Sequence, residues 1–243
     1  LSGVVRISTG YSFGFALRTD GRVWCWGYNG NGELGDGTGS TRSRAAVVPN
    51  LFDVVHISAG HNHACAVRDN GTVWCWGYNA YGQLGNGTAT ASTIPVMVPG
   101  FNGAVEVTCG ALHTCVRLSS GQVRCWGYNG YGQLGDNTVT TNYSPVEVDV
   151  NTTNSVLTSA VQLTSGIYHT CARISDGTVR CWGYNGYGEL GNGTTTAARI
   201  ATPVQELRPG ASSPITLTGV RHVYAGYYQR SEEHTSELQS LTN

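Results

Sequence analysis

The sequence predicts an all-β fold, a β-propeller built from tandem four-stranded blades, and three observations support this prediction. One pattern of residues recurs four times, at spacings of 50, 50 and 56 residues. Glycine accounts for 34 of the 243 residues, about twice its usual share, while charged residues reach only 12%, about half of theirs. Both shifts are typical of short strands and tight turns, and a period near 50 residues is the size of one propeller blade.

Each copy of the pattern contains two motifs in the same order. The first has the form G-x-x-H, with Phe13 in place of the histidine in the first repeat, and the second reads W-G-Y-N-x-x-G-x-L-G. The equivalent glycines of the first motif are Gly10, Gly60, Gly110 and Gly166, and the tryptophans of the second are Trp26, Trp76, Trp126 and Trp182. A fifth copy begins at Val220 and reaches Gly226. The chain therefore contains four repeats and the start of a fifth.

The second repeat shows how one unit divides into strands. The candidate strands are Val54–Ser58, His63–Arg68, Thr72–Trp76 and Pro95–Val98. The second and third flank the turn Asp69-Asn70-Gly71, and turn residues between two alternating runs indicate a hairpin. Blades of a propeller stack face to face, so we expect most strands to be covered on both sides.

The two motifs, together with the Asp-Gly or Ser-Gly hairpin turn between them, resemble the repeat of the RCC1 (regulator of chromosome condensation) family. The kelch repeat has a similar length, but it usually carries a Gly-Gly pair, which this chain lacks. The resemblance implies a propeller that typically has seven blades, here of a bacterial secreted type. It also implies functions that range from nucleotide exchange on a small GTPase through chromatin association to the inhibition of secreted enzymes, and the fold does not select among them.

The resemblance extends over residues 1–229, which we interpret as a propeller fragment with an incomplete ring. The repeats are expected near 4–53, 54–103, 104–159 and 160–219, with a partial repeat at 220–229. Residues 230–243 read RSEEHTSELQSLTN, in which glycine is absent and three glutamates fall within eight residues. This string resembles one reading frame of a sequencing adapter, so we predict a non-native tail and leave it out of the functional argument. A polar helix that caps the array is the alternative.

Three pairs of cysteines are each separated by ten residues and flank the hairpin turn symmetrically. The pairs are Cys65 with Cys75, Cys115 with Cys125, and Cys171 with Cys181. Directly opposed residues of an antiparallel hairpin are close enough for bridging after a small adjustment, so we predict three disulfides. Disulfides indicate an oxidising compartment, which predicts an extracellular, periplasmic or cell-surface location. Cys25 and Cys109 have no such partner and are expected to be buried thiols.

Two features of the repeat could be mistaken for metal sites. His63, His113 and His169 occupy equivalent positions, but Phe13 fills the same position in the first repeat, which favours a packing role. The loop from Asn29 to Thr38 carries scattered oxygen ligands that faintly suggest calcium, but its acidic residues become Gln83 and Asn86 in the second repeat. We therefore predict no metal and no cofactor, and interpret the loop as a glycine- and asparagine-dependent turn.

The segments that vary between repeats are the candidates for partner binding, because insertions in repeat folds collect on one face. The third and fourth repeats are lengthened by polar stretches at Asn142–Ser159 and Thr194–Leu217. Tyrosine and arginine are favoured at interfaces, and those in or near these stretches are Tyr131, Tyr143, Tyr187, Arg199 and Arg208. We expect these side chains to contact a protein partner.

Bulk charge and hydropathy restrict the function further. The net charge is −1 and the chain contains no lysine, whereas a nucleic-acid surface needs a basic excess. No apolar run reaches the roughly 18–20 residues that span a membrane. No sequence motif of a hydrolase or nucleotide-binding site is visible. We therefore predict a non-catalytic, extracytoplasmic protein-binding scaffold. A guanine-nucleotide exchange factor and a non-catalytic part of a larger secreted enzyme are the alternatives.

Overall fold

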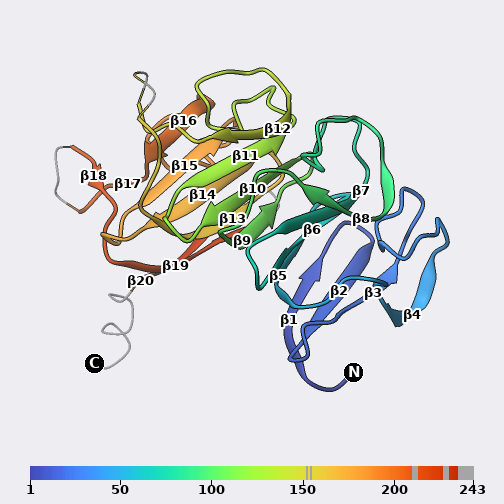
Figure 1. Ribbon diagram of the computed structural model, residues 1–243. Helices are drawn as coiled ribbons and strands as arrows, with labels where there is room; N and C mark the ends of the chain where they lie inside the picture. The colour runs from blue at the N-terminus through green and yellow to red at the C-terminus, as the bar shows by residue number, and fades with distance from the viewer. Residues whose placement is uncertain (152, 154, 210–212, 227–229, 235–243) are drawn as a thin grey trace, which may run out of the picture.

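The structure is a computed structural model that describes residues 1–151, 153, 155–209 and 213–226 together with the backbone of 230–234. Four antiparallel sheets of four strands follow one another along the chain, and within each sheet the strands pair in sequence order (Figure 1). No helix occurs in the described ranges, so none there has the length and apolarity to cross a membrane. We call the four sheets blades 1 to 4, and they confirm the predicted all-β propeller architecture.

The sixteen blade strands have nearly uniform lengths. They are, in blade 1, β1 (Val4–Thr9), β2 (Phe13–Arg18), β3 (Val23–Gly27) and β4 (Arg42–Val47); in blade 2, β5 (Val54–Ala59), β6 (His63–Arg68), β7 (Val73–Gly77) and β8 (Ser92–Val98); in blade 3, β9 (Ala104–Cys109), β10 (His113–Leu118), β11 (Val123–Gly127) and β12 (Asn142–Glu147); and in blade 4, β13 (Ala160–Ser165), β14 (His169–Ile174), β15 (Val179–Gly183) and β16 (Ala198–Pro203).

The rest of the described chain forms two short hairpins. Strands β17 (Gln205–Glu206) and β18 (Ile215–Thr216) pair with each other after blade 4. Strand β19 (Val220–Ala225) starts the fifth repeat and pairs with β20 (Arg230–His234). The first five residues of the segment expected to be a non-native tail therefore lie in a strand, and not in the helix considered as an alternative. The remaining part of that segment, 235–243, lies outside the described residues, and its non-native origin stays a prediction.

The predicted strands of the second repeat agree with the structure except for the last. Strand β6 has the predicted bounds, and β5 and β7 differ from the prediction by a single residue at one or both ends. Strand β8 begins at Ser92, three residues before the predicted start at Pro95. Proline favours edge strands because it cannot donate a ladder hydrogen bond, and β8 is the outermost strand of its sheet. The proline therefore lies inside a strand without interrupting the sheet.

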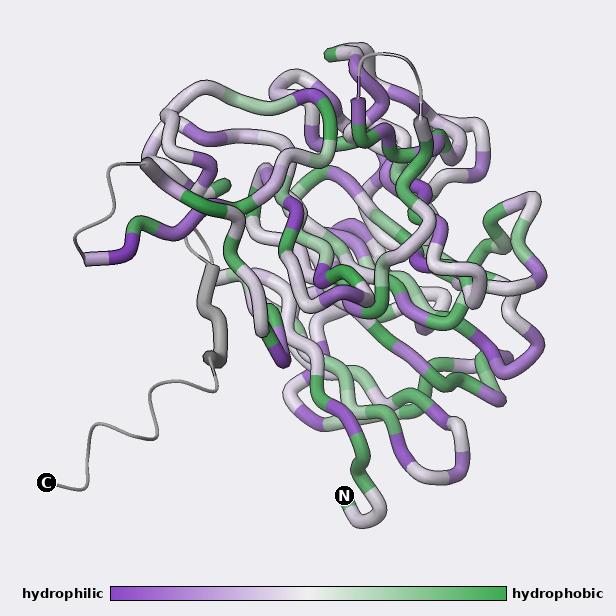
Figure 2. The backbone as a smooth tube through the Cα atoms, turned by 90° about the vertical axis from the view of Figure 1, so that its left-hand side faces the viewer, coloured by the Kyte–Doolittle hydropathy of each residue, from purple (hydrophilic) through white to green (hydrophobic). Residues whose placement is uncertain are grey.

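The blades are arranged around an axis that is surrounded by their first strands. Strand β9 of blade 3 contacts the first strands of both neighbours, β5 and β13. The second strands are the most deeply buried, since neighbouring blades cover both of their faces, as in β6, where five of six residues are buried. Figure 2 shows hydrophobic stretches returning in strand after strand, separated by paler or hydrophilic loops. The hydrophobic core is accordingly divided into several clusters, each shared by adjacent blades.

The two ends of the blades form different rims. The loop rim consists of the loops 28–41, 78–91, 128–141 and 184–197, and the turn rim consists of the hairpin turns 19–22, 69–72, 119–122 and 175–178. Backbone hydrogen bonds join neighbouring blades at both rims. At the loop rim Gly87 N–H donates to the carbonyl of Tyr143 at 3.0 Å, and at the turn rim Ala104 N–H donates to the carbonyl of Gly71 at 3.1 Å.

One tryptophan fastens each blade to the preceding loop. The indole Nε1–H of Trp126 donates to the carbonyl of Gln83 at 2.8 Å, and its ring covers Gly85, where a β-carbon would lie 2.6 Å from Nε1. Equivalent bonds join Trp76 to Glu33 and Trp182 to Gln133. These three tryptophans are fully buried, whereas Trp26 is half-buried, since no described blade precedes it. The W-G-Y-N-x-x-G-x-L-G motif therefore supplies both halves of the junction between blades.

Candidate functional site

Each loop of the loop rim is held from inside by one asparagine. In blade 3, Asn129 Nδ2 donates to Asp136 Oδ1 at 3.0 Å, to Thr138 Oγ1 at 3.1 Å and to the Thr140 carbonyl at 3.1 Å. Asn129 Oδ1 accepts the Leu134 N–H at 3.0 Å. The equivalent residues Asn29, Asn79 and Asn185 are also buried. The amide fills the centre of the loop that faintly suggested calcium, which supports the interpretation of the loop as a turn.

Two histidines of the G-x-x-H motif connect blade 2 to blade 3 and blade 3 to blade 4. His63 and His113 are fully buried, and their Nε2 atoms lie 2.9 Å and 2.8 Å from the hydroxyl oxygens of Thr114 and Thr170. Because the Thr114 hydroxyl donates to the carbonyl of Gln83 at 2.9 Å, the His63 Nε2–H is the donor in the first pair. Burial lowers the pKa of both histidines to about 3, so both are neutral at physiological pH.

The glycines of the same motif lie under the histidine rings. A β-carbon at Gly60 would lie 2.5 Å from His63 Cε1, and one at Gly110 would lie 2.1 Å from His113 Cε1. The same contact is repeated between Gly166 and His169, at 2.2 Å. Glycine is required at these positions because the ring occupies the space of any larger side chain.

The six cysteines of the repeat form three disulfides, each between directly opposed residues of the second and third strands. The bridges are Cys65–Cys75, Cys115–Cys125 and Cys171–Cys181, each with a Cα–Cα distance of 4.1 Å. They are compatible with an oxidising environment. In blade 1 the position opposite Cys25 is held by Phe15, a buried ring in edge contact with Trp76.

Cys25 and Cys109 are buried free thiols, as expected from the sequence. The Cys25 thiol donates to the carbonyl of Ala46 at 3.3 Å, and the Cys109 thiol donates to the carbonyl of Ser58 at 3.4 Å. Burial raises the pKa of both thiols to about 12. Because the thiolate is the reactive form, neither residue is an activated nucleophile.

The most prominent surface feature of the loop rim is a continuous row of tyrosines, which we call the tyrosine ridge. Its members are Tyr81, Tyr128, Tyr131, Tyr168, Tyr184 and Tyr187. Successive rings meet at tilted or edge-to-face angles with centroids 5.0–6.3 Å apart, the range favoured by aromatic pairs. Tyr81 and Tyr131 are 38% and 39% exposed, and Tyr187 is 80% exposed. The ridge crosses blades 2, 3 and 4.

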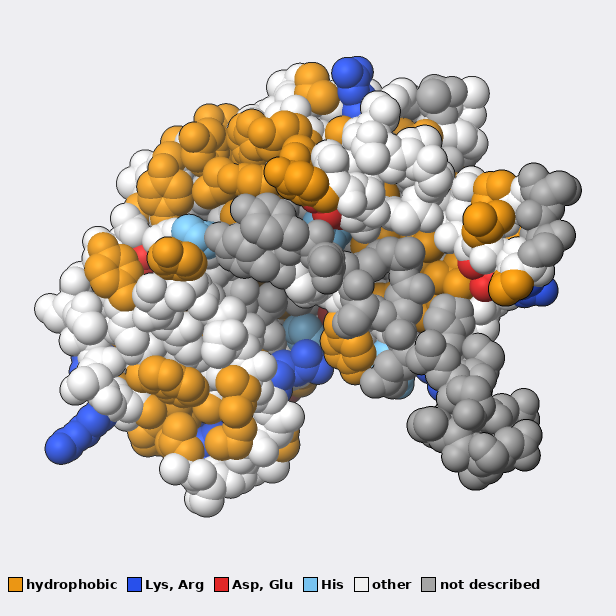
Figure 3. All heavy atoms as spheres, turned by 180° about the vertical axis from the view of Figure 1, so that it is seen from behind, with side chains coloured by type: hydrophobic (Ala, Val, Ile, Leu, Met, Phe, Trp, Pro, Cys, Tyr) orange, Lys and Arg blue, Asp and Glu red, His pale blue; other side chains and the backbone are white. Residues whose placement is uncertain are grey.

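The ridge arises because the tyrosine at one position of the repeat packs against the tyrosine at another position of the next repeat. Tyr81 of blade 2 meets Tyr128 of blade 3, and Tyr131 of blade 3 meets Tyr184 of blade 4 in the same way. In blade 1 the position equivalent to Tyr81 is Asn31. Hydrophobic side chains, which in Figure 3 include tyrosine, gather in several patches on the face shown there. The sequence prediction named Tyr131 and Tyr187 but missed the other four members, although tyrosines at fixed positions of consecutive repeats are a detectable pattern.

Two other predicted contact residues flank the ridge. Tyr143 and Arg199 are the second residues of β12 and β16, at the ends of these strands next to the loop rim. A β-carbon at Gly82 would lie 2.6 Å from the Tyr143 ring, and one at Gly132 would lie 2.8 Å from Arg199 Cα. Both residues are exposed, and each covers the glycine that follows a ridge tyrosine. Tyr143 and Arg199 therefore extend the surface of the ridge outward.

The structure separates Arg208 from this group. Arg208 is exposed, pairs with Glu206 at 2.7 Å and lies between β17 and β18. The lengthened connections follow the last residues of β12 and β16. Both begin next to the turn rim, because Val148 N–H donates to the carbonyl of Val123 and Val204 N–H to that of Val179, and these two acceptors directly follow the hairpin turns. Because a strand carries its two ends to opposite rims, Arg208 follows the end of β16 next to the turn rim and lies apart from the tyrosine ridge.

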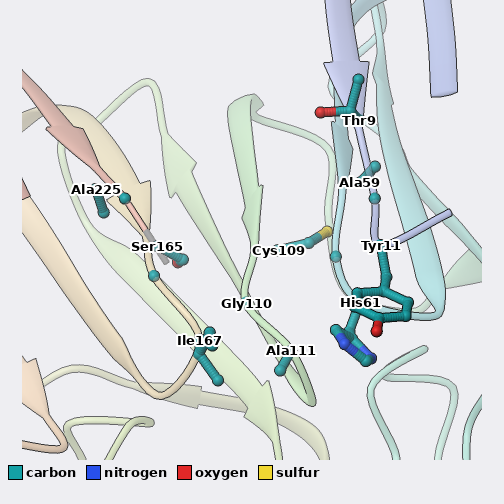
Figure 4. A pocket seen from close by; sticks show the side chains of 14 residues that line it. Thr9, Tyr11, Ala59, His61, Cys109, Gly110, Ala111, Ser165, Ile167 and Ala225 are labelled. Atoms are coloured by element: carbon teal, nitrogen blue, oxygen red, sulfur yellow. The ribbon is translucent and has the colours of Figure 1, made fainter. Parts of the chain in front are cut away.

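A pocket of about 370 Å³ lies on the axis, where the first strands end. Equivalent residues of five repeats line it, and they are mostly small, such as Ala59, Cys109, Ser165 and the motif glycines (Figure 4). Tyr11 and His61 lie side by side on one wall, with ring centroids 4.3 Å apart (Figure 4). No carboxylate is among the described residues that line it, and besides the two aromatic rings the wall offers the hydroxyls of Thr9 and Ser165, the Cys109 thiol and backbone groups.

Four-stranded blades joined by tryptophan–glycine and histidine–threonine contacts define a repeat propeller, with a tyrosine-rich rim as its distinctive surface. Residues 1–229 match the family model described as RCC1-like domain. The chain belongs to this RCC1-like family, which confirms the resemblance seen in the sequence. No curated protein matches the chain by sequence.

Solved structures with the same fold include proteins from yeast and human. Yeast RCC1 (Prp20) bound to Kap60 superposes with a TM-score of 0.74 at 19% identity, over 96% of this chain and 55% of the other. Prp20p from Saccharomyces cerevisiae, described with its binding properties to Gsp1p and histones, has a TM-score of 0.70 at 19% identity, over 97% and 57%. Human WBSCR16 has a TM-score of 0.62 at 19% identity, over 96% and 72%. The chain thus spans little more than half the length of the yeast protein, and the likeness establishes the fold.

Proposed function

We propose that this chain is a protein-binding module whose tyrosine ridge makes the central contact with the partner. The observation that carries this proposal is the continuity of the ridge over three blades, with ring centroids never more than 6.3 Å apart. Tyrosine is enriched at protein interfaces, and a ring already packed against its neighbours loses little conformational entropy on binding.

The chemistry of the loop rim favours a polypeptide partner over a nucleic acid. Single-stranded nucleic acids also stack on aromatic rings, but the proteins that bind them combine stacking with a positively charged groove. This chain has a net charge of −1 and no lysine, and the exposed cation next to the ridge is Arg199. The ridge therefore presents hydroxyl groups and ring edges without the basic field that phosphate binding needs.

We propose in addition that the chain is extracytoplasmic and non-catalytic. Three disulfides support an extracytoplasmic location, since such bonds persist in oxidising compartments. No carboxylate is among the described residues that line the axial pocket, and burial raises the pKa of both free thiols, which supports a non-catalytic role. Yeast RCC1 (Prp20), which has this fold, was solved with the protein Kap60 bound, and this is consistent with a protein partner.

A selection for peptide ligands tests the ridge directly. The bait is the oxidised chain, and the counter-bait carries serine in place of the three exposed ridge residues Tyr81, Tyr131 and Tyr187. A matched control replaces Phe52, an aromatic residue of similar exposure at 49% in the connection that follows β4, with serine. Each variant is first checked for an unchanged far-ultraviolet circular dichroism spectrum, because exposed side chains are not needed for the fold.

The expected result is a set of displayed peptides that bind the wild-type chain and the Phe52→Ser variant equally but bind the triple variant at least about tenfold more weakly, a loss of about 1.4 kcal/mol. Peptides that bind all three baits equally would show that the ridge is not the contact surface. A selection that yields only ligands lost in Phe52→Ser would assign binding to the opposite rim and overturn the proposal.

A further inference from the structure

The tyrosine ridge does not extend to the junction of blades 1 and 2, where the same positions of the repeat carry smaller side chains. At the junction of blades 3 and 4 the ring of Tyr168 lies against Tyr128 and Tyr131, with centroids 6.3 Å and 5.5 Å away. At the junction of blades 1 and 2 the positions equivalent to Tyr168 and Tyr131 are held by Asn62 and Asn31. Asparagine is shorter than tyrosine and has no ring, so two rings are missing from this part of the loop rim.

A cavity of about 300 Å³, which we call the junction pocket, lies at this place. The described residues that line it are Tyr11, Ser12, Phe13 and Tyr28 of blade 1 with His61 and Asn62 of blade 2. Four of these six residues carry an aromatic ring, and a mostly aromatic wall with a few polar groups is typical of binding sites. Tyr28 and Asn62 are the equivalents of Tyr128 and Tyr168. The cavity therefore corresponds to the space that the Tyr168 ring fills in the other junction.

One buried carboxylate fixes the two asparagines. Glu33 is fully buried, and its oxygens accept the Asn31 N–H at 2.8 Å, Asn31 Nδ2–H at 2.7 Å and Asn62 Nδ2–H at 3.2 Å. Both side-chain amides are thus bound to the same carboxylate. The junction pocket is therefore formed before any partner binds, and a preformed site reduces the cost of ordering side chains on binding.

The same network orients His61. Because Asn62 Nδ2 donates to Glu33, Asn62 Oδ1 is the acceptor for the His61 Nδ1–H, 2.6 Å away. In the neutral imidazole Nε2 is then a hydrogen-bond acceptor. The His61 ring also packs against Tyr11, and this pair lines both the junction pocket and the axial pocket (Figure 4). The junction pocket thus combines aromatic rings with an acceptor for a hydroxyl group.

We propose that the junction pocket receives one tyrosine side chain of the partner protein, whose ring takes the place that Tyr168 fills between blades 3 and 4. This inference rests on the proposed protein-binding function and adds one chemical feature of the partner. Aromatic side chains that fill a pocket are typical centres of binding energy at interfaces, and aromatic pairs favour the tilted contacts that Tyr168 makes with its neighbours. The phenol O–H of the incoming tyrosine donates to His61 Nε2, a bond that phenylalanine cannot make.

Titration of the ¹⁵N-labelled oxidised chain with N-acetyl-tyrosinamide, followed by NMR, tests the junction pocket without the rest of a partner. We expect saturable shifts of the backbone amides of Ser12, Tyr28 and Asn62. The equivalent junction of blades 3 and 4 is the internal control, and the amides of Tyr128 and Tyr168 should not shift.

Two related amides separate the contributions of the ring and of the hydroxyl group. N-acetyl-leucinamide should bind about tenfold more weakly, because it lacks the aromatic contacts. N-acetyl-phenylalaninamide should bind about fivefold more weakly, because it lacks the hydroxyl donor.

Two variants and one control make the assignment specific. Asn62→Tyr introduces the residue found at the equivalent Tyr168, and Tyr28→Ser removes an exposed ring from the wall. Each should weaken binding of the tyrosine amide at least about tenfold, as expected for the loss of an anchor site. Phe52→Ser, which removes an exposed ring outside the junction pocket, should bind the amide like the wild type. Each variant is first checked for an unchanged far-ultraviolet circular dichroism spectrum.

The absence of saturable binding, equal affinities for the tyrosine and leucine amides, or equal binding by the wild type and both pocket variants would overturn the proposal. These results concern the junction pocket alone. Displayed peptides that are lost in the triple variant of Tyr81, Tyr131 and Tyr187 would still support the ridge as the contact surface. Conversely, saturable binding of the amide would support the junction pocket even if no peptide depended on the ridge.

Discussion

Replacing Gly85 with alanine tests the junction on which the propeller depends. Gly85 has a φ of +65°, and a β-carbon there would lie 2.6 Å from Trp126 Nε1. Gly100 also has a positive φ, +85°, but a β-carbon there would meet nothing within 4 Å. The pair Gly85→Ala and Gly100→Ala therefore separates the steric contact between blades from the cost of left-handed backbone alone.

The magnitude follows from two contributions. A non-glycine residue in the left-handed region costs about 1–3 kcal/mol, and this cost applies to both variants. Forcing extra volume into a packed junction costs about a further 1–3 kcal/mol, and this cost applies to Gly85→Ala alone. We expect Gly85→Ala to unfold at a lower urea concentration than Gly100→Ala, with a difference of about 1–3 kcal/mol in the free energy of unfolding.

Urea unfolding of the oxidised chain, followed by tryptophan fluorescence, measures this difference. A second measurement identifies the partner of the clash. If the added methyl group strikes the indole, Gly85→Ala combined with Trp126→Phe will be less destabilised than the sum of the two single variants, because the smaller ring relieves the contact. Equal midpoints for Gly85→Ala and Gly100→Ala, or strictly additive effects in the double variant, would refute the packing of the indole on the loop glycine.

Three further changes have defined outcomes. His113→Phe, which introduces the residue found at the equivalent Phe13, should flatten the pH dependence of stability. The pKa of His113 in the folded chain, near 3, is below its unfolded value, so the free energy of unfolding of the wild type falls between pH 6.5 and 3, by about 2 kcal/mol at pH 5. An unchanged slope of this free energy from pH 7 to 4.5 in urea titrations would contradict the prediction. Joint replacement of Cys115 and Cys125 by alanine should lower the free energy of unfolding by about 2–3 kcal/mol, measured by urea unfolding beside the oxidised wild type. Asn129→Ala should lower the free energy of unfolding by about 1–3 kcal/mol, because the buried Leu134 N–H loses its acceptor, Asn129 Oδ1. It should also speed hydrogen exchange across 130–140 while exchange in blade 1 stays the same.

The sequence by itself determined the blade. The strands of one repeat, the hairpin register and the three disulfides depend on contacts between residues that are close in the chain, and Cys115 faces Cys125 because both flank one tight turn. The repeated glycine and tryptophan positions also predicted the stacking of blades. The sequence predicted that β8 starts at Pro95, whereas it starts at Ser92. An edge strand tolerates proline, and the start of β8 is held by the neighbouring blade, where Gly37 N–H donates to the carbonyl of Thr93.

Only the tertiary structure decided how the repeats meet. The rotation from one blade to the next brings Tyr131 beside Tyr184 and Cys109 beside Cys65, and neither spacing has a local geometric meaning in the chain. Within a blade the two ends of a strand lie at opposite rims, so Tyr143 near the start of β12 lies at the loop rim, whereas Arg208 follows the end of β16 that lies next to the turn rim. The physical reason is that a strand fixes the distance between its own residues, whereas contacts between blades depend on the packing of whole sheets around an axis.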